Sequence, residues 1–453
     1  MGKVIPIVYL TTFLFLFGES LQPAPRAELY ERILCRNHYR STTDVIHDCK
    51  ISAVQQQLAL LGGLERLSNF IPSLFAIPFA ALADRYGHSF ILSLAFFGIF
   101  LEELWPMIVC YFPDIFPIRL IWLHFIFNIF GGGQTMIWTL LHVIVADHVD
   151  ATTRSTIFFR IRAAGTGSAV IGYAASGALM KISIWLPLII ALTSFLLGMV
   201  AMMFVPSQRV GKSDDADNES WQDRIRSAIQ YPKFVFSVLS GNAKVMIIMA
   251  LVTIAQLGFD SLPLMLSIYV SKKFEWSFAN ASFLHSLQML VELTTCLTIL
   301  PLIAMGLSRY GVSPFSKDLY IAQGSVAALV IGLWCLGLAP VIGLAVFGIV
   351  MAGLGTAQES VLRSMVTDMV DPEGVSIAYS AMTMLRTIGA SVSGPIYAGL
   401  YAAGLDHGWS WLGLPYLFAG GLFALIFVVL LFFKDSSAYQ PIPNEEVVDE
   451  DDA

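Results

Sequence analysis

Apolar residues along this chain fall into twelve long runs that are separated by polar stretches. Most runs hold roughly 20 residues or more, the length that an α-helix needs to cross the hydrocarbon core of a bilayer. The pattern predicts an all-α membrane protein with twelve transmembrane helices. The expected spans are Val4–Gln22, Ala53–Ala83, Phe90–Phe112, Ile118–Ala146, Thr156–Met180, Trp185–Phe204, Val245–Val270, Phe278–Leu307, Leu319–Leu338, Val341–Met365, Ser376–Ala402 and Leu412–Phe433.

A polar interruption after the sixth run divides the chain into halves. The pattern predicts four regions: an N-terminal six-helix bundle at 1–204, a cytoplasmic central loop at 205–244, a C-terminal six-helix bundle at 245–433 and an acidic cytoplasmic tail at 434–453. In the central loop, Trp221, Ile225, Ala228 and Ile229 fall at helical spacing. They predict an amphipathic helix on the membrane surface, unless the segment is only a tether.

Two short patterns recur in the same order in both halves. Residues 85–89 (RYGHS) return as residues 309–313 (RYGVS), at an offset of 224, and residues 147–150 (DHVD) return as 368–371 (DMVD), at an offset of 221. Nearly equal offsets indicate an internal duplication of a six-helix unit. The two bundles should therefore be pseudo-symmetric, as in carriers whose substrate site lies between two halves.

Composition narrows the class further. The chain of 453 residues is 56% hydrophobic and 13% charged, whereas soluble domains carry about 25% charged residues. No basic block suggests nucleic acid, and the five cysteines show no metal-ligand spacing. Because no nucleophile–base pair or metal motif stands out, we expect neither an enzyme nor a bound cofactor or metal. The expected partners are a small organic solute, protons and the lipid bilayer, with the protein as a monomer.

Basic residues indicate the orientation. With the N-terminus inside, sixteen Lys and Arg residues lie on the cytoplasmic side and nine on the other, with Arg66 inside a span. Both termini should therefore be cytoplasmic, in the plasma membrane in preference to the vacuolar membrane. The first run also resembles a signal peptide, but its removal would leave eleven spans and break the duplication. We interpret it as the first transmembrane helix.

Residues 82–87 (LADRYG) lie in a short connection between the second and third spans. They resemble the signature of the major facilitator superfamily, although Ala80, His88 and Ser89 depart from the usual residues. Helix number, central loop and duplication agree with this likeness. Residues 30–35 (YERILC) and 49–50 (CK) further resemble fungal members related to the proton-coupled folate and haem carriers.

The resemblance implies a conformational lock at Asp84, Arg85 and Gly87 on the cytoplasmic side. The carboxylate of Asp84 would face the positive end of a helix that starts near Ser376. Gly87 would permit a tight turn between two helices. The alternative is an ordinary charged turn that follows the excess of cytoplasmic basic residues.

Ionisable residues inside membrane spans are costly, so they are functional candidates. On the eighth span, His285, Gln288 and Glu292 share one helix face. They predict proton coupling, or alternatively a polar seam that only joins helices. Arg386, deep in the eleventh span, needs an acidic partner or an anionic ligand and suggests an anionic or amphiphilic solute. Asp260 is a gate residue or a solvated helix end.

The N-terminal half offers fewer candidates. Glu65 lies on the second span, and His124 and Asn128 share a face of the fourth. Glu102 and Glu103 lie on the third span, which in the resembling family usually lies outside the cavity, so we expect a structural role for them. The fifth span lacks the Gly-Pro pattern of family antiporters, which disfavours a drug/proton antiporter.

Cys35 and Cys49 share one polar, outward loop, and we expect them to form a disulfide; two free thiols are the alternative. Asn280 begins a glycosylation sequon that lies close to the eighth span. Together these features predict a secondary active transporter that moves a small organic solute by alternating access, coupled to protons. A transport-inactive receptor or scaffold with the same fold is the alternative. Substrate and direction do not follow from the sequence.

Overall fold

The computed structural model describes residues 4–40, 48–149, 151–205, 243–367 and 375–433. All regular secondary structure in these ranges is helical. The predicted amphipathic helix at 221–229 and the acidic tail lie outside the described residues, as does the second copy of the repeated pattern at 368–371.

The N-terminal half contains α1 (Val4–Leu21), α2 (Pro23–His38), α3 (Ser52–Ser68), α4 (Phe70–Leu74), α5 (Ala76–Tyr86), α6 (His88–Tyr111), η1 (Ile118–His124), α7 (Phe125–Asn128), α8 (Gly133–His148), α9 (Ala151–Met180) and α10 (Trp185–Met203). The C-terminal half contains α12 (Ala243–Phe259), α13 (Ser261–Lys273), α14 (Phe278–Thr294), the π-helical turn η2 (Thr295–Ile299), α15 (Leu300–Arg309), α16 (Pro314–Leu338), α17 (Ile342–Leu354), η3 (Gly355–Ala357), α18 (Gln358–Thr367), α19 (Val375–His407), η4 (Trp409–Trp411) and α20 (Leu414–Leu431).

Nine helical stretches among the described residues are long and apolar enough to cross a membrane. Three further long stretches, α3–α5, α9 and α19, are not among those nine. With them the structure is consistent with the twelve crossings expected. The same three lie at the boundary between the halves, where α3 packs on α19 and α9 packs on α14. Each of these stretches therefore has a protein neighbour along part of its length.

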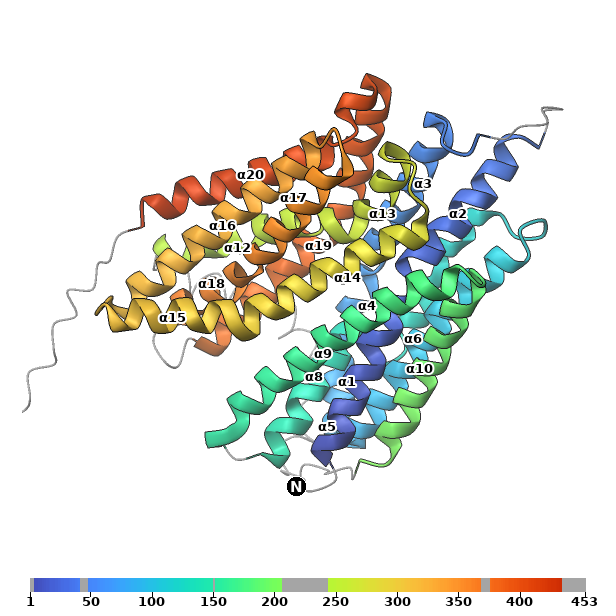
Figure 1. Ribbon diagram of the computed structural model, residues 1–453. Coiled ribbons are helices and arrows are strands. Elements are labelled where there is room, and N and C mark those ends of the chain that lie inside the picture. The colour runs from blue at the N-terminus through green and yellow to red at the C-terminus, as the bar shows by residue number, and fades with distance from the viewer. Residues whose placement is uncertain (1–3, 41–47, 150, 206–242, 368–374, 434–453) are drawn as a thin grey trace, which may run out of the picture.

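The two halves diverge from one end of the molecule to the other (Figure 1). We call the end that carries the start of α1 and the end of α20 the terminal end. We call the end that carries the loop between α2 and α3 the disulfide end. At the disulfide end, α2, α3 and α13 come together, whereas at the terminal end α5 and α15 lie far apart.

The apolar cores follow the same division. One core contains only residues of the N-terminal half, including Phe15 and Phe96. The other joins Tyr269 of the C-terminal half to Tyr30 and Leu58, which lie on α2 and α3 near the disulfide end. Continuous apolar packing between the halves therefore exists near the disulfide end, where it stabilises their association.

Two expected spans differ from the structure. The first helix does not stop at Gln22, because Pro23 and Pro25 begin a new helix, α2, which continues to His38. Pro is well accepted in the first turn of a helix, where its missing N–H has no partner to lose. The expected single helix over Ile118–Ala146 is interrupted at Gly131–Gly133, where three successive glycines have φ of +84°, +81° and +71°.

The repeated signature places a glycine with positive φ in a helix–helix turn in both halves. Gly87 has φ of +99° between α5 and α6, and Gly311 has φ of +71° between α15 and α16. Glycine adopts this left-handed region without the penalty that a Cβ brings. The duplicated RYG pattern is thus explained by a duplicated helix–turn–helix.

The halves approach most closely where α3 crosses α19. A Cβ added to Gly63 would lie 2.6 Å from the carbonyl oxygen of Gly394, so neither position has space for a side chain. Small residues at helix crossings allow backbones to approach within the membrane. This crossing fixes the distance between the halves in the observed conformation.

Candidate functional site

A cavity of about 600 Å³ lies between the halves. Most of its wall comes from α1, α2, α3, α6, α8 and α9, and the C-terminal half contributes residues of α13, α14 and α19. Pockets of about 300–1,000 Å³ suit drug-sized organic ligands. The wall mixes apolar side chains with four glutamates and two arginines: Glu19, Glu65, Glu102, Glu103, Arg26 and Arg66.

Arg26 is the centre of a cluster on this wall. Its guanidinium binds Glu65 at 2.8 Å, forms an ion pair with Glu103, and donates to Gln22 at 3.0 Å. Tyr30 donates to the same Glu65 oxygen at 3.4 Å. A planar guanidinium can satisfy several acceptors at once, which suits it to a partly buried charge cluster. In this cluster the positive charge of Arg26 is shared by two carboxylates, those of Glu65 and Glu103.

His124 lies behind the wall and holds a third glutamate. Its Nδ1 is 3.0 Å from Glu102, and its Nε2 is 3.1 Å from the Ser68 hydroxyl. Both ring nitrogens therefore have partners, and the His124 ring is only 2% exposed. Of the three candidates from the N-terminal half, Glu65 and Asn128 line the cavity and His124 does not.

Two acids of the C-terminal half meet arginines of the N-terminal half. Asp260, at the junction of α12 and α13, lies 3.3 Å from Arg66 of α3. Glu292, on α14, lies 4.0 Å from Arg162 of α9. Asp260 is 4% exposed, so the interpretation of it as a solvated helix end is wrong. Each pair joins groups that belong to different halves.

Arg386 has its acidic partner within its own half. Glu359 binds both Arg386 and Arg363, the second at 3.1 Å. Arg386 also donates to Gln256 at 3.0 Å, and Gln256 donates to Asp260 at 3.1 Å. A polar network therefore runs from Glu359 through Arg386 to Asp260, and Ser393 adds a bond of 2.8 Å to that carboxylate.

The predicted stripe on α14 lies against α9, away from most of the cavity wall. His285 is 3.1 Å from the Ser267 hydroxyl and stacks on Tyr173 of α9, with ring centroids 5.1 Å apart. Gln288 is 3% exposed, and its Oε1 has no hydrogen-bond partner among the described residues. The three stripe residues thus face the contact between halves, and they are not among the residues that line the cavity.

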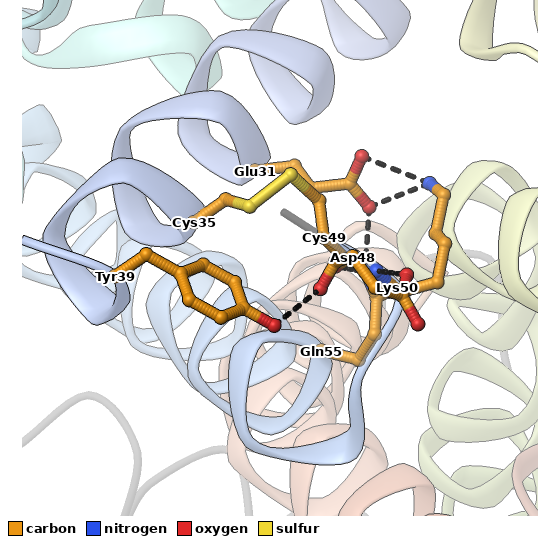
Figure 2. The surroundings of a disulfide bond; sticks show 7 residues. All are labelled: Glu31, Cys35, Tyr39, Asp48, Cys49, Lys50 and Gln55. Carbon is orange, nitrogen blue, oxygen red and sulfur yellow. Dashed lines mark hydrogen bonds and ion pairs between the residues drawn. A yellow bond between two sulfur atoms is a disulfide. The ribbon is translucent and has the colours of Figure 1, made fainter. Parts of the chain in front are cut away.

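The disulfide end is closed by side chains around a covalent link. Cys35 and Cys49 form a disulfide between the end of α2 and the start of α3 (Figure 2). Next to it, Lys50 binds both oxygens of Glu31, at 2.6 and 2.8 Å, while Gln55 donates to the same carboxylate. Tyr39 donates to the Asp48 carbonyl at 3.2 Å. These bonds order the loop that carries Lys50.

That loop also contacts the other half. Lys50 donates to Ser271 at 2.6 Å and lies 4.7 Å from the centre of the Phe278 ring. Lys272 donates to the Lys50 carbonyl at 2.5 Å, and Gln56 of α3 binds Asp406 of α19 at 2.7 Å. The disulfide end therefore holds the two halves together through several polar contacts.

At the terminal end, the contacts described for residues 85–88 stay within the N-terminal half. Helix α5 packs on α4, α6 and α8 of its own half. Arg85 is exposed, with its guanidinium 5.7 Å from the Tyr86 ring, and His88 lies 3.2 Å from Asp147 in the same half. The Asp84 side chain lies outside what the structure describes. The lock stays a prediction, because the terminal ends are apart in this conformation.

Sequence reasoning missed part of the site. Glu19 and Arg26 line the cavity but were not singled out, although Glu19 is an acid within a predicted span and carried the same signal as Glu292. Arg26 was assigned to a loop because the start of α2 was not recognised. Glu102 and Glu103 also line the cavity, so their placement outside it is wrong.

Comparison with known proteins adds three findings. A family model described as Major Facilitator Superfamily matches residues 41–311. The chain is 29% identical to the MFS efflux pump atnC of Emericella nidulans over 450 residues, which covers 95% of this chain and 88% of that protein. It is 30% identical to the efflux pump ustT of Aspergillus flavus over 433 residues, 89% of this chain and 83% of that protein.

Among solved structures, the nucleoside transporter NupG matches with a TM-score of 0.66 at 13% identity. The match covers 94% of this chain and 99% of NupG. At this identity the likeness concerns the fold alone.

Proposed function

The chain belongs to the major facilitator superfamily, and from that premise we propose that it exports a small organic solute by alternating access, driven by protons. Membership makes the chain a multi-pass membrane transporter and not an enzyme. Export is suggested by the relatives, which are named efflux pumps; we give this more weight than the missing Gly-Pro pattern of the fifth span, which disfavoured a drug/proton antiporter. A transport-inactive scaffold is disfavoured, because a scaffold has no evident need for a charged cavity between its halves.

The observation that carries proton coupling is the pair of acids that meet arginines across the boundary. Asp260 and Glu292 take their basic partners, Arg66 and Arg162, from the other half. When the halves rock about the crossing of α3 and α19, the Glu292–Arg162 pair between α14 and α9 separates, whereas Arg66–Asp260, which lies next to that crossing, and pairs within one half persist. A buried carboxylate that loses its counter-ion is more stable when protonated. Movement and protonation are thereby linked.

Glu292 is the stronger coupling candidate of the two. Asp260 keeps Gln256 and Ser393 as partners within its own half. For Glu292, the described basic partner is Arg162 of the other half, and 13% of the glutamate side chain is exposed. We therefore retain Glu292 as the coupling residue, with His285 and Gln288 as neighbours that shape the contact between α14 and α9.

Transport into vesicles tests this proposal. Inside-out vesicles that contain the protein are incubated with a small-molecule extract of the organism that makes it, and mass spectrometry follows uptake. At least one solute should accumulate several-fold when the lumen is acidic, and not in vesicles that lack the protein. No such solute with correctly inserted protein would contradict export. A tag after Ala453 should be digestible on the outside of these vesicles.

The coupling residue is tested in the same vesicles. Glu292→Gln should abolish accumulation against a gradient while exchange of solute persists, because the variant binds but no longer links to protons. Glu275→Gln, which alters an exposed acid in the loop before α14, is the matched control and should behave like the parent. Uphill transport by Glu292→Gln would exclude this residue as the coupling site.

We further propose that both termini are cytoplasmic and that the plasma membrane holds the protein. The excess of basic residues predicted for the terminal side supports this orientation. So does the disulfide, since disulfides persist on the side exposed to an oxidising space. The likeness to carriers of folate and haem and the monomeric state stay predictions, as does the expectation that the sequon at Asn280 lies too close to the eighth span to be used.

A further inference from the structure

We propose that the cavity binds an organic cation, and that the carboxylate of Glu19 receives its ammonium group. This inference rests on the proposed function, since it names the class of solute for that cavity. Two observations support it: the pairing of charges on the cavity wall, and a buried amide oxygen there that has no hydrogen-bond partner among the described residues.

The charges on the wall do not cancel. Of the described residues that line the cavity, four are glutamates and two are arginines, which leaves two negative charges in excess. Arg26 binds Glu65 and Glu103, and Arg66 binds Asp260 behind the wall. Both arginines therefore have protein carboxylates as partners, and although Nε of Arg66 has no hydrogen-bond partner among the described residues, an anionic solute would have to compete with those carboxylates.

Glu19 is the acid left over. Glu65 and Glu103 have Arg26, and Glu102 has His124. No hydrogen bond or ion pair joins Glu19 to another described residue. A carboxylate in a low-dielectric cavity requires a counter-charge or a donor. An ammonium group supplies both, because it carries a positive charge and three N–H donors.

Asn128 provides a second, independent indication of a ligand with donors. Its side chain is 5% exposed, it borders the cavity, and its Oδ1 accepts no hydrogen bond from any described residue. Buried polar atoms are nearly always satisfied in folded proteins, so an unpaired one on a cavity wall indicates a missing donor. A solute that carries N–H groups would satisfy Asn128 as well as Glu19.

The remaining wall suits the apolar part of such a solute. Leu16 and Ile99 lie beside the acids, and Tyr173 and Met289 contribute surface from α9 and α14. Aromatic faces attract cations, and thioethers adapt to irregular apolar groups. The site thus accommodates an amphiphilic amine better than a small inorganic cation.

The position of Arg386 bears on the anionic or amphiphilic solute that this residue suggested. That arginine is bound by Glu359 and Gln256 and does not line the cavity. Arg386 therefore has protein partners within the C-terminal half and lies off the cavity wall, so it gives no support for an anionic solute in this cavity.

Direct binding tests the inference without requiring transport. The purified full chain is titrated with three dansyl compounds of equal chain length that end in a primary amine, a hydroxyl or a carboxylate, and fluorescence reports binding. The amine should bind at least tenfold more tightly than the hydroxyl compound, and the carboxylate most weakly. Equal affinity of the amine and hydroxyl compounds, or tighter binding of the carboxylate, would overturn the proposal.

Variants locate the effect. Glu19→Gln should weaken binding of the amine at least tenfold and change that of the hydroxyl compound less than twofold. Glu19→Asp keeps the charge and should retain most of the affinity, and Glu275→Gln should have no effect. An unchanged amine affinity in well-folded Glu19→Gln would refute the role of Glu19. Should Glu19→Gln fail to fold, the ranking of the three compounds on the unaltered protein still decides the solute class.

The two proposals fail separately. If the amine compound binds as expected but no solute accumulates in vesicles, export is wrong and the cation site stands. If an extract solute accumulates with the pH gradient and the amine compound shows no preference, export stands and the cation site is wrong.

Discussion

At the disulfide end, Lys50 of the N-terminal half binds Ser271 of the C-terminal half, and Gln56 binds Asp406. At the terminal end, by contrast, α5 packs within its own half, and the signature residue His88 pairs with Asp147 of that half. The same boundary between two bundles is therefore joined at one end and separated at the other (Figure 1).

This difference shows what the alternate conformation would require. The bonds of Lys50 and Gln56 would have to break, and the terminal ends of α5 and α15 would have to meet. The crossing of Gly63 and Gly394 lies between the two ends and would persist as the halves rock about it. Alternating access then depends on a balance between polar contacts at opposite ends, with a close backbone contact between them.

The largest expected effect comes from the helix crossing. Gly394→Ala should reduce surface-normalised transport at least tenfold, because a Cβ there would lie 2.9 Å from the Arg66 Cβ and would strike the Gly63 backbone. Gly399→Ala, on the same helix with open space around it, is the control and should transport normally. Normal transport by Gly394→Ala at normal abundance would show that the crossing is not constrained.

Lys50→Met should open the disulfide end. It removes the ion pair with Glu31 and the bond to Ser271 while keeping an apolar side chain of similar length. A cysteine introduced at Thr387, on the cavity wall, reports which end is open. In a background without other free cysteines, labelling from the disulfide side should rise several-fold.

The double variant Lys50→Met/Glu31→Gln controls for the carboxylate that Lys50→Met leaves without its cation, and should be better folded than the single variant. If labelling from the disulfide side is unchanged in both, Lys50 does not hold this end closed.

Asp84→Asn should have the smallest effect, and it should change labelling of the Thr387 cysteine in the direction opposite to Lys50→Met. If Asp84 faces a helix N-terminus when the terminal end is closed, the interaction contributes about 0.3–1 kcal/mol. Its loss should therefore reduce labelling of the Thr387 cysteine from the disulfide side by about two- to fivefold. Asp84→Glu keeps the charge and should retain most of that labelling. Increased labelling in Asp84→Asn would contradict a lock.

Much of the architecture followed from the sequence because membrane crossing imposes a single requirement on length and hydropathy. The number of apolar runs, the division after the sixth run and the turn at Gly87 each depend on local pattern. Helix ends were less certain: Pro23 was interpreted as the end of a helix, although Pro also starts helices. The interruption at Gly131–Gly133 was missed because glycine is found both where two continuous helices pack closely and where a helix is broken.

The site was predicted only in part, since pairing depends on which helices are neighbours. Glu65 and Asn128 were found because ionisable and amide groups inside spans are conspicuous. The partner of Glu65 was not found, because Arg26 falls after the expected end of the first span and was assigned to a loop. Nor could the sequence indicate that Glu292 faces Arg162 and lies off the cavity wall, since this follows from the contact of α14 with α9.

The three crossings that are less apolar than the rest have a consequence for biosynthesis. A segment with a polar face gains less free energy when it enters the bilayer alone. Helix α3 is made early, yet it packs on α19, which is the last crossing but one to be synthesised. Until α19 arrives, the face of α3 that carries Gln56 and Gly63 has no helix to cover it. Chains that end before Val375 should therefore remain assembly intermediates, exposed to the quality control that removes incomplete membrane proteins.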